Sequence, residues 1–184
     1  MEVDNPQIPL FRNAIDEMNL VEIPFALTGR SINRHVLELS PGGSTRIVAD
    51  AGVAGLPTAL GERVMLGLLW YHNNNYPGTP RFRLHFNKFA EQYLYPDRTY
   101  KINTRALRDI EEQITRIAHT RIISDKWFDR GTGKHVKMDS SIIDYIKESP
   151  RGGGPRVLEI KWGDEFFKSL EDKYTRGFDY RFFL

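Results

Sequence analysis

The strongest pattern of apolar and polar positions lies between residues 104 and 119. Apolar side chains recur there at steps of three and four residues, which is the spacing of one face of an α-helix. These side chains are Leu107, Ile110, Ile114 and Ile117. Charged and polar residues occupy most of the other positions. The pattern predicts an amphipathic helix over residues 104–119 that buries this apolar face.

A shorter helix and a turn are predicted before this helix, and a β-hairpin is predicted after it. A shorter helix is predicted from Asn87 to Leu94, and the side chain of Asn87 is suited to capping its first free N–H groups. Pro96 ends that helix in the turn Tyr95–Arg98. Residues 120–138 have the pattern of a β-hairpin with its bend at 130–134. Helix, turn, helix and basic hairpin in this order are typical of a winged helix-turn-helix, whose second helix enters the DNA major groove.

Other patterns predict the supporting elements. Strands are expected at 35–39, 45–49, 81–86 and 157–162, and helices at 58–73 and 163–173. Helix 58–73 is apolar over most of its surface and should form the centre of the core. Strand 81–86 alternates between apolar and polar residues and is expected to complete the winged-helix sheet with the two hairpin strands. Residues 140–148 fit either a strand or a short helix.

These elements predict an α+β fold in three parts. Residues 1–16 form a flexible arm, 17–149 a winged-helix DNA-binding domain, and 150–184 a C-terminal extension that begins within a loop rich in glycine and proline. Aromatic and apolar residues crowd the end of the chain after Phe178. We expect this end to contact either a second copy of the chain or a second winged-helix domain that the sequence does not contain.

Composition limits the class of protein. With 184 residues the chain can bury one good core. The absence of cysteine excludes disulfides, thiolate zinc sites and cysteine catalysis, and it fits a reducing cytoplasm. The sequence has neither an apolar stretch long enough to span a bilayer nor the pattern of a signal peptide. The expectation is a cytoplasmic protein that does not bind membranes.

The distribution of charge favours a nucleic-acid surface. The whole chain carries 26 basic and 24 acidic residues, a net charge of +2. Residues 98–137 alone contain 10 basic and 5 acidic residues, a difference of +5, which leaves −3 for the rest. Positive charge is therefore concentrated on the predicted helix-turn-helix and hairpin. Neutralisation of phosphates by such a surface supplies most non-specific affinity for DNA.

The candidate contacts lie on the polar side of the second helix and on the hairpin. Guanidinium groups suit both phosphates and the O6/N7 edge of guanine, whereas cations on the hairpin suit phosphates better than bases. The candidate DNA-binding residues are Arg98, Lys101, Asn103, Thr104, Arg105, Arg108, Arg116, Arg130, Lys134 and Lys137. The alternative is an ordinary charged helix face, and Asp109, Glu111 and Glu112 are consistent with it.

Catalytic patterns are weak. The nearest approach to a metal-dependent nickase is His85-Phe86-Asn87, which lacks the second histidine of such sites. Asp97 and the run Glu159-Ile160-Lys161 resemble a nuclease motif, but more than sixty positions separate them. The glycines at 131 and 133 lack the flanking residues of a phosphate-binding loop. We therefore expect no enzyme activity, metal or cofactor. A winged-helix transcriptional regulator, or a winged helix that binds only proteins, remains an alternative.

Four segments together resemble the plasmid replication initiator protein A family. They are residues 16–27, Gly55–Leu60, the helix-turn-helix around Tyr95-Pro96, and Trp162–Phe167. The resemblance covers residues 16–184 and implies a winged-helix initiator that binds double-stranded DNA repeats at a plasmid-type origin. It also implies that the protein recruits host replication proteins and represses its own gene as a homodimer. Relatives commonly continue into a second winged-helix domain, whereas this chain stops at Leu184.

Overall fold

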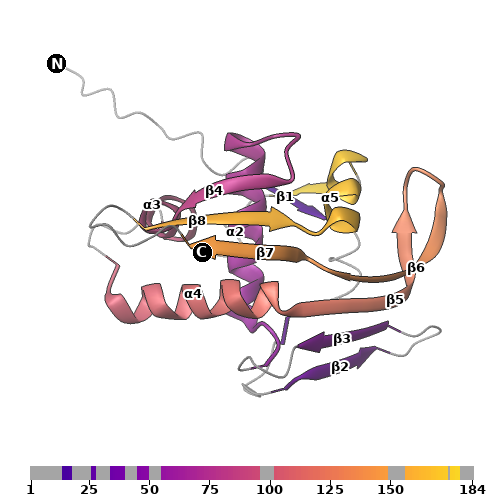
Figure 1. Cartoon of the computed structure of the whole chain (residues 1–184), viewed down its shortest axis with the longest axis horizontal. Coiled ribbons are helices and arrows are strands. Elements are labelled where there is room, and N and C mark those ends of the chain that lie inside the picture. The colour runs from indigo at the N-terminus through magenta and orange to yellow at the C-terminus, as the bar shows by residue number, and fades with distance from the viewer. Residues whose placement is uncertain are drawn as a thin grey trace.

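The computed structural model describes residues 14–17, 26–27, 34–39, 45–49, 55–95, 102–148, 156–173 and 175–178 (Figure 1). The elements are β1 (Ala14–Glu17), β2 (Val36–Leu39), β3 (Thr45–Ala49), α2 (Ala59–Asn75), β4 (Arg81–His85), α3 (Phe86–Phe89), η1 (Ala90–Leu94), α4 (Thr104–Ala118), β5 (Thr120–Asp129), β6 (Lys134–Ser141), β7 (Ile143–Glu148), β8 (Val157–Trp162), α5 (Asp164–Glu171) and β9 (Thr175–Phe178). The short segment η1 is a π-helical turn that continues α3 directly.

The described strands form three antiparallel sheets. Their strand orders are β1-β9, β2-β3-β5-β6 and β4-β8-β7. Helices and antiparallel sheets in one chain agree with the α+β class. The order helix, helix, hairpin is also present, in α3/η1, α4 and β5–β6. None of the helices in the described ranges is long and apolar enough to cross a membrane.

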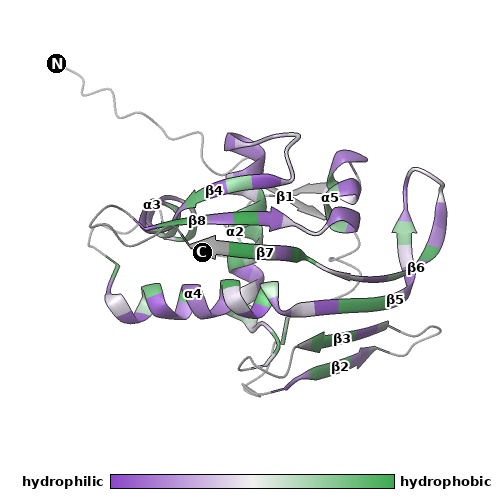
Figure 2. Cartoon of the chain, viewed as in Figure 1, coloured by the Kyte–Doolittle hydropathy of each residue, from purple (hydrophilic) through white to green (hydrophobic). Residues whose placement is uncertain are grey.

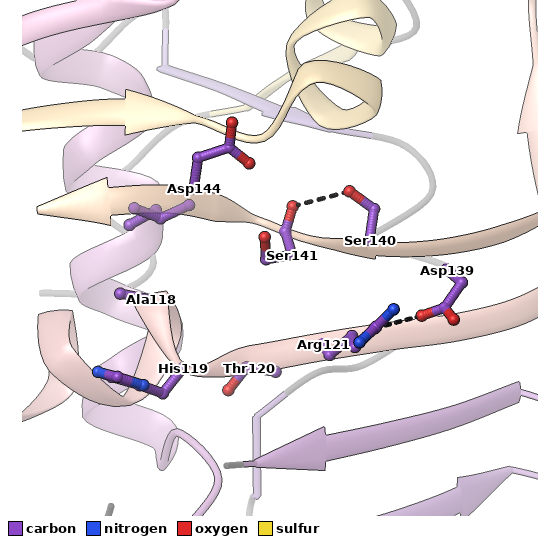
Figure 3. A pocket seen from close by; sticks show the side chains of 9 residues that line it. Ala118, His119, Thr120, Arg121, Asp139, Ser140, Ser141 and Asp144 are labelled. Atoms are coloured by element: carbon purple, nitrogen blue, oxygen red, sulfur yellow. Dashed lines mark hydrogen bonds and ion pairs between the residues drawn. The ribbon is translucent and has the colours of Figure 1, made fainter.

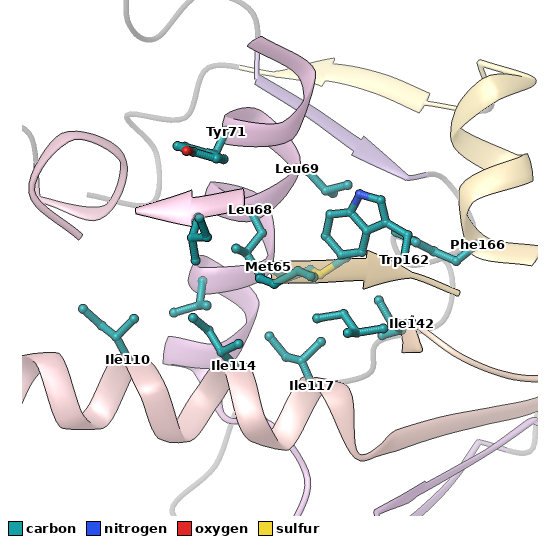
Figure 4. Close-up of a cluster of buried hydrophobic side chains, with 14 of the residues drawn as sticks. Met65, Leu68, Leu69, Tyr71, Ile110, Ile114, Ile117, Ile142, Trp162 and Phe166 are labelled. Carbon is teal, nitrogen blue, oxygen red and sulfur yellow. The ribbon is translucent and has the colours of Figure 1, made fainter. Parts of the chain in front are cut away.

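Helix α2 forms the centre of the core. Its residues from Val64 to His72 are all buried. Figure 4 shows Ile110, Ile114 and Ile117 on the side of α4 that faces α2. On another side of α2, the fully buried Trp162 of β8 lies beside Phe166 of α5. The predictions of a central core helix and of an amphipathic second helix are therefore confirmed.

The amphipathic pattern of α4 is visible in its colouring by hydropathy, where hydrophobic and hydrophilic residues alternate turn by turn (Figure 2). The helix ends at Ala118, and β5 begins at Thr120, so that α4 leads almost directly into the hairpin. The hairpin bend falls at the predicted place, between Asp129 and Lys134. Gly133 occupies the left-handed region there with φ +67°, which glycine adopts without strain.

The pairing of β4 was not predicted correctly. The alternation of residues 81–86 led us to expect a sheet made of this strand and the two hairpin strands. In the structure, β4 pairs with β8, and β7 lies on the other side of β8, whereas the hairpin strand β5 pairs with β3. Period-two alternation shows which face of a strand is buried but not which strand is its neighbour. The sheet expected for a winged helix is therefore replaced by two separate sheets.

Two boundaries also differ from the prediction. The helix expected to begin at Asn87 begins at Phe86, whose N–H donates to the Arg156 carbonyl at 3.1 Å, so Asn87 lies inside the helix rather than at its cap. The sequence assigns residues 1–16 to a flexible arm, yet Ala14–Glu17 pairs with β9. Likewise, β8 and α5 belong to the same core as α2, although the sequence places them in a separate extension.

Some predicted features fall outside the described residues. They include most of the segment 18–27, the turn at residues 96–101 with Arg98 and Lys101, the loop 149–155 and the end 179–184. Of the first segment, Leu27 is described: it is buried, and its N–H donates to the Pro57 carbonyl at 2.8 Å just before α2. Residues 143–148, for which strand and helix were both open, form β7.

Candidate nucleic-acid interface

The start of α4 is fixed by a side-chain cap. Asn103 has an extended backbone, and its Oδ1 accepts a hydrogen bond from the Ala106 N–H at 2.8 Å. An asparagine in this position satisfies one of the four free N–H groups of a helix start and typically contributes about 1 kcal/mol. Thr104 follows and is exposed. The cap thus uses one atom of Asn103, while its amide nitrogen and Thr104 stay at the surface.

Two arginines of the N-terminal half of α4 are available for contacts. Arg105 and Arg108 are both exposed. Neither forms an ion pair with a carboxylate in the described part of the chain, although Asp109 follows Arg105 at the i+4 position. Because the apolar side of α4 is held against α2, these two side chains extend from a rigid support. Arg105 and Arg108 therefore remain the best-placed candidates for DNA contacts.

Arg116 does not lie on the exposed face, and this expectation was wrong. Its side chain is only 3% exposed. The guanidinium donates to Glu112 Oε1 through Nη2 at 2.6 Å and through Nε at 3.1 Å, and Nη1 donates to the buried Leu56 carbonyl at 3.0 Å. On a helix, Arg116 follows the buried Gln113 by three positions and so lies on the same side as that residue, from where a long side chain can turn inward. Arg116 holds α4 against the start of α2.

Other polar contacts fix the position of α4. Arg156, just before β8, forms a two-pronged ion pair with Glu111, in which Nη1 lies 2.7 Å from Oε2. The same guanidinium lies 5.0 Å from the ring centroid of Phe86 in α3. The buried Gln113 accepts a hydrogen bond from the Thr58 N–H at 3.0 Å and so completes the N-terminus of α2. The recognition-helix candidate is thereby tied to α2, α3 and β8.

The first helix of the candidate helix-turn-helix also carries a cation, outside the basic segment 98–137 of the sequence. Lys88 of α3 is exposed, and the described residues offer it no carboxylate partner. In helix-turn-helix proteins the first helix crosses the DNA backbone, where lysine suits phosphate contacts. The signal was its position in a predicted helix whose apolar residues, Phe86 and Phe89, are buried. Lys88 therefore joins the candidate contacts.

The tip of the hairpin is docked on α5 rather than free. One carboxylate oxygen of Asp129 accepts hydrogen bonds from the N–H groups of Gly131 at 2.9 Å and Thr132 at 3.3 Å. The other oxygen lies 3.1 Å from the Lys168 ammonium of α5. This lysine is the main reason that the pKa of Asp129 is lowered, and the carboxylate in turn raises the pKa of Lys168. The hairpin tip is therefore held in place by α5.

The cations of the hairpin have different environments. Arg130 is exposed, but its guanidinium donates to the Lys173 carbonyl just after α5. Lys134 and Lys137 of β6 are exposed and have no ion pair with a described carboxylate. A shift of register between Ser124 and Trp127 interrupts the pairing of β5 with β6. Past this point the hairpin bends toward α5 (Figure 1).

The hairpin tip is far from the start of α4. In Figure 1, α4 and the first part of β5 continue in nearly the same direction. A helix rises about 1.5 Å per residue, so Arg105 to Ala118 spans about 20 Å. A strand rises about 3.3 Å per residue, so Thr120 to Ser124 adds about 13 Å. Arg105 and Ser124 are therefore about 33 Å apart along this line, and the hairpin tip lies beyond Ser124.

A polar cleft of about 470 Å³ lies where α4 meets β5 (Figure 3). Its charged side chains have partners: Arg121 forms an ion pair with Asp139, and Asp144 with Lys161. Lys161 also forms an ion pair with Asp164, and Asp144 and Asp164 together raise the pKa of Lys161. His119 and the serine hydroxyls complete the lining. Within the described ranges, no three His, Asp or Glu side chains are close enough to hold a metal ion.

Comparison with known proteins identifies a similar fold. No protein-family model matches the chain, and no curated protein matches it. Two crystal structures are similar. One is of selenomethionine derivatives of domain 2 and domain 3 of RctB, with a TM-score of 0.54 and 15% sequence identity over 88% of this chain and 63% of that chain. The other contains RctB domains 2-3, with a TM-score of 0.50 and 14% identity over 82% and 58%.

This likeness concerns the fold alone, because the sequence identity is very low. The chain spans about three fifths of the length of the RctB fragments that it matches. Membership of the plasmid initiator family stays a prediction, and so do the winged-helix assignment and the DNA-contacting role of each candidate residue. What the comparison does show is a fold similar, in coarse terms, to that of RctB, which is a replication initiator.

Proposed function

We propose that this chain binds double-stranded DNA through the N-terminal half of α4, in the role of a replication initiator at the repeats of a plasmid-type origin. The observation that carries the proposal is the pair Arg105 and Arg108, exposed and without a described carboxylate partner, on a helix whose start is capped by Asn103. The proposal assigns the chain a binding role and no catalytic step.

The chemistry of this surface suits the edges of bases. Arg105 and Arg108 are three positions apart and so lie on the same side of the helix. A guanidinium can donate two hydrogen bonds to O6 and N7 of guanine, and the N-terminal residues of a recognition helix are the ones that reach the bases. The N-terminal end of α4 also carries the positive end of the helix dipole. Of the three acidic residues of α4, Glu111 and Glu112 already bind arginines of the protein itself.

The fold likeness to RctB supports the wider role but not its details. The origin repeats, the homodimer, the recruitment of host replication proteins and autorepression come from the resemblance of the sequence to plasmid initiators. They are part of the proposal. A transcriptional regulator with the same fold would also bind DNA through α4. Replication of an origin-bearing plasmid that depends on this protein would separate the two roles.

Selection of bound sequences from a random duplex pool would first identify the DNA site. Binding of that site should then be measured by fluorescence anisotropy for Arg105→Ala and Arg108→Ala. If each arginine reads a base, each change should cost about 1–3 kcal/mol of binding and relax the preference at one position. Arg46→Ala, which removes an exposed arginine of β3, is the matched control. Full-strength binding by the Arg105/Arg108 double variant would contradict the proposal.

A further inference from the structure

The positive charge of the hairpin tip is balanced by its neighbours. The hairpin tip and α5, with the residues just after α5, together contain five basic and five acidic residues. The basic residues are Arg130, Lys134, Lys137, Lys168 and Lys173, and the acidic residues are Asp129, Asp164, Glu165, Glu171 and Asp172. The positive charge that the sequence places on the hairpin is therefore balanced in space by α5.

The contacts of the hairpin tip reduce its ability to bind phosphate further. Lys168 is engaged by Asp129, and Arg130 by the Lys173 carbonyl. A paired cation must give up its partner before it can neutralise a phosphate, whereas an unpaired cation only releases solvent and counterions. The bend of the hairpin toward α5 also carries the tip away from the line of α4 (Figure 1). The tip is thus poorly suited to hold DNA that α4 reads.

The end of the molecule formed by α3 and β4 also carries cations without an ion pair, as the hairpin does in Lys134 and Lys137, and it lies on the side of the N-terminal half of α4 (Figure 1). Arg83 of β4 and Lys88 of α3 are exposed, and neither has a carboxylate partner among the residues that the structure describes. The backbone at Arg83 is fixed, because its carbonyl accepts a hydrogen bond from the hydroxyl of Tyr71 at 2.9 Å. Burial raises the pKa of Tyr71 to about 12, so this hydroxyl remains a donor at any physiological pH.

This cationic end lies next to α4. The guanidinium of Arg156 joins the two, since it binds Glu111 of α4 on one side and contacts the ring of Phe86 on the other. Phe86 is two residues before Lys88 and three after Arg83. In Figure 1, α3 and the end of β4 lie on the same side of the molecule as the N-terminal half of α4. The elements that carry Arg83 and Lys88 therefore lie on the same side of the molecule as the half of α4 that carries Arg105 and Arg108.

We infer that the DNA backbone beside the groove entered by α4 is held by Arg83 and Lys88, and that the hairpin tip does not grip it. This inference rests on the proposed function, since it concerns the same duplex. It assigns phosphate contacts to β4 and α3 instead of the wing. The duplex then lies across the end of the molecule formed by α3 and the start of α4, and does not run along β5 toward α5.

Two double variants of equal charge loss test this inference. Arg83→Ala with Lys88→Ala removes two cations from the end next to α4, and Lys134→Ala with Lys137→Ala removes two from the hairpin. All four side chains are exposed, so neither pair should change stability by more than about 0.5 kcal/mol per residue. Thermal unfolding of each variant verifies this. Binding to a short random-sequence duplex is then measured over a series of salt concentrations.

The salt dependence gives the expected result directly. Each phosphate contact contributes about 0.9 to the slope of log K against log salt. The Arg83/Lys88 variant should therefore bind more weakly, and its slope should be smaller in magnitude by about 1.8. The Lys134/Lys137 variant should keep the slope of the wild type. A loss of slope in the hairpin variant, or none in the Arg83/Lys88 variant, would overturn the inference.

The Arg105/Arg108 double variant separates this outcome from failure of the proposed function. If the wild-type chain does not bind the duplex, or binds it equally well without Arg105 and Arg108, the proposed role of α4 fails. If those arginines matter and the loss of Arg83 and Lys88 has no effect on the slope, only the placement of the backbone contacts fails. A protein partner at Arg83 and Lys88 would give this second result.

Discussion

Replacement of Arg116 by alanine should unfold the protein more readily without weakening its contacts to DNA. The sequence placed Arg116 among the DNA-binding residues of α4, but the structure buries it to 3% exposure between Glu112 and the Leu56 carbonyl. A residue that supports the helix and one that touches DNA have opposite signatures. The first affects the free energy of unfolding, and the second affects the free energy of binding.

The size of the effect follows from the contacts of Arg116. Loss of its Nη1 donor leaves the carbonyl of Leu56, a fully buried residue, without this hydrogen bond, at a cost of about 1–3 kcal/mol. Two buried methylenes are also removed, at about 0.8 kcal/mol each. Glu112 adds little, because its side chain is 46% exposed and water can replace the arginine. The sum is about 3–5 kcal/mol, or roughly 10 °C in Tm for a chain of this length.

Urea unfolding followed by tryptophan fluorescence would measure the stability, and anisotropy with duplex DNA at a temperature where both proteins are folded would measure the binding. Arg105→Ala is the matched control, since it should leave stability within about 0.5 kcal/mol of the wild type and weaken binding. The reasoning is refuted if Arg116→Ala is as stable as the wild type but binds DNA poorly. That result would mean that the side chain leaves its buried position to reach the DNA.

Two further predictions concern the core. A Cβ atom on Gly163 would lie 2.1 Å from the Ser141 carbonyl oxygen, so Gly163→Ala should lower the free energy of unfolding in urea by about 3 kcal/mol or more. Gly78 has open space around it but a φ of +73°, so the control Gly78→Ala should lower it by only about 1–2 kcal/mol. Equal losses in the two variants would contradict the steric explanation. His72 is buried among aromatic rings, and desolvation lowers its pKa below the usual 6.5. Well above pH 6.5 the imidazole is neutral in both the folded and the unfolded chain. Below pH 6.5 the unfolded chain binds a proton more readily than the folded one, so Tm should fall as the pH drops. The fall in Tm should be smaller in His72→Gln. Parallel losses in both proteins would exclude His72 as the cause.

Local patterns in the sequence predicted the secondary structure of the candidate site well. The three- and four-residue spacing of isoleucines located α4 to within one residue of its observed end, because burial of one helix face is a local property of the chain. The hairpin bend was located by its glycines for the same reason, since a left-handed turn needs glycine where it occurs. Arg105 and Arg108 were correctly placed on the exposed side of the helix.

Properties that depend on distant residues could not be obtained in this way. The partner of β4 is β8, more than seventy positions later, and nothing in the alternation of residues 81–86 specifies it. The start of α3 was missed because a backbone carbonyl of Arg156, and not a neighbouring side chain, accepts the first free N–H. The burial of Arg116 could not be predicted, because its position on the helix does not show that its side chain donates to the carbonyl of Leu56, sixty residues earlier.

The charge around the hairpin also differs between the sequence and the folded structure. The excess of +5 over residues 98–137 was the main sequence argument for a DNA surface that includes the hairpin. Folding brings α5, with carboxylates at 164, 165 and 171, next to the hairpin tip, although about forty residues separate them in the sequence. Because a phosphate responds to all charges within about 8–10 Å, it is the folded neighbourhood that determines its binding. By that measure the hairpin tip is less suited to phosphate than its sequence suggests, because α5 balances its charge and Arg130 is engaged by the Lys173 carbonyl. Lys88 lies outside the basic segment of the sequence, but it is exposed and has no ion pair with a described carboxylate.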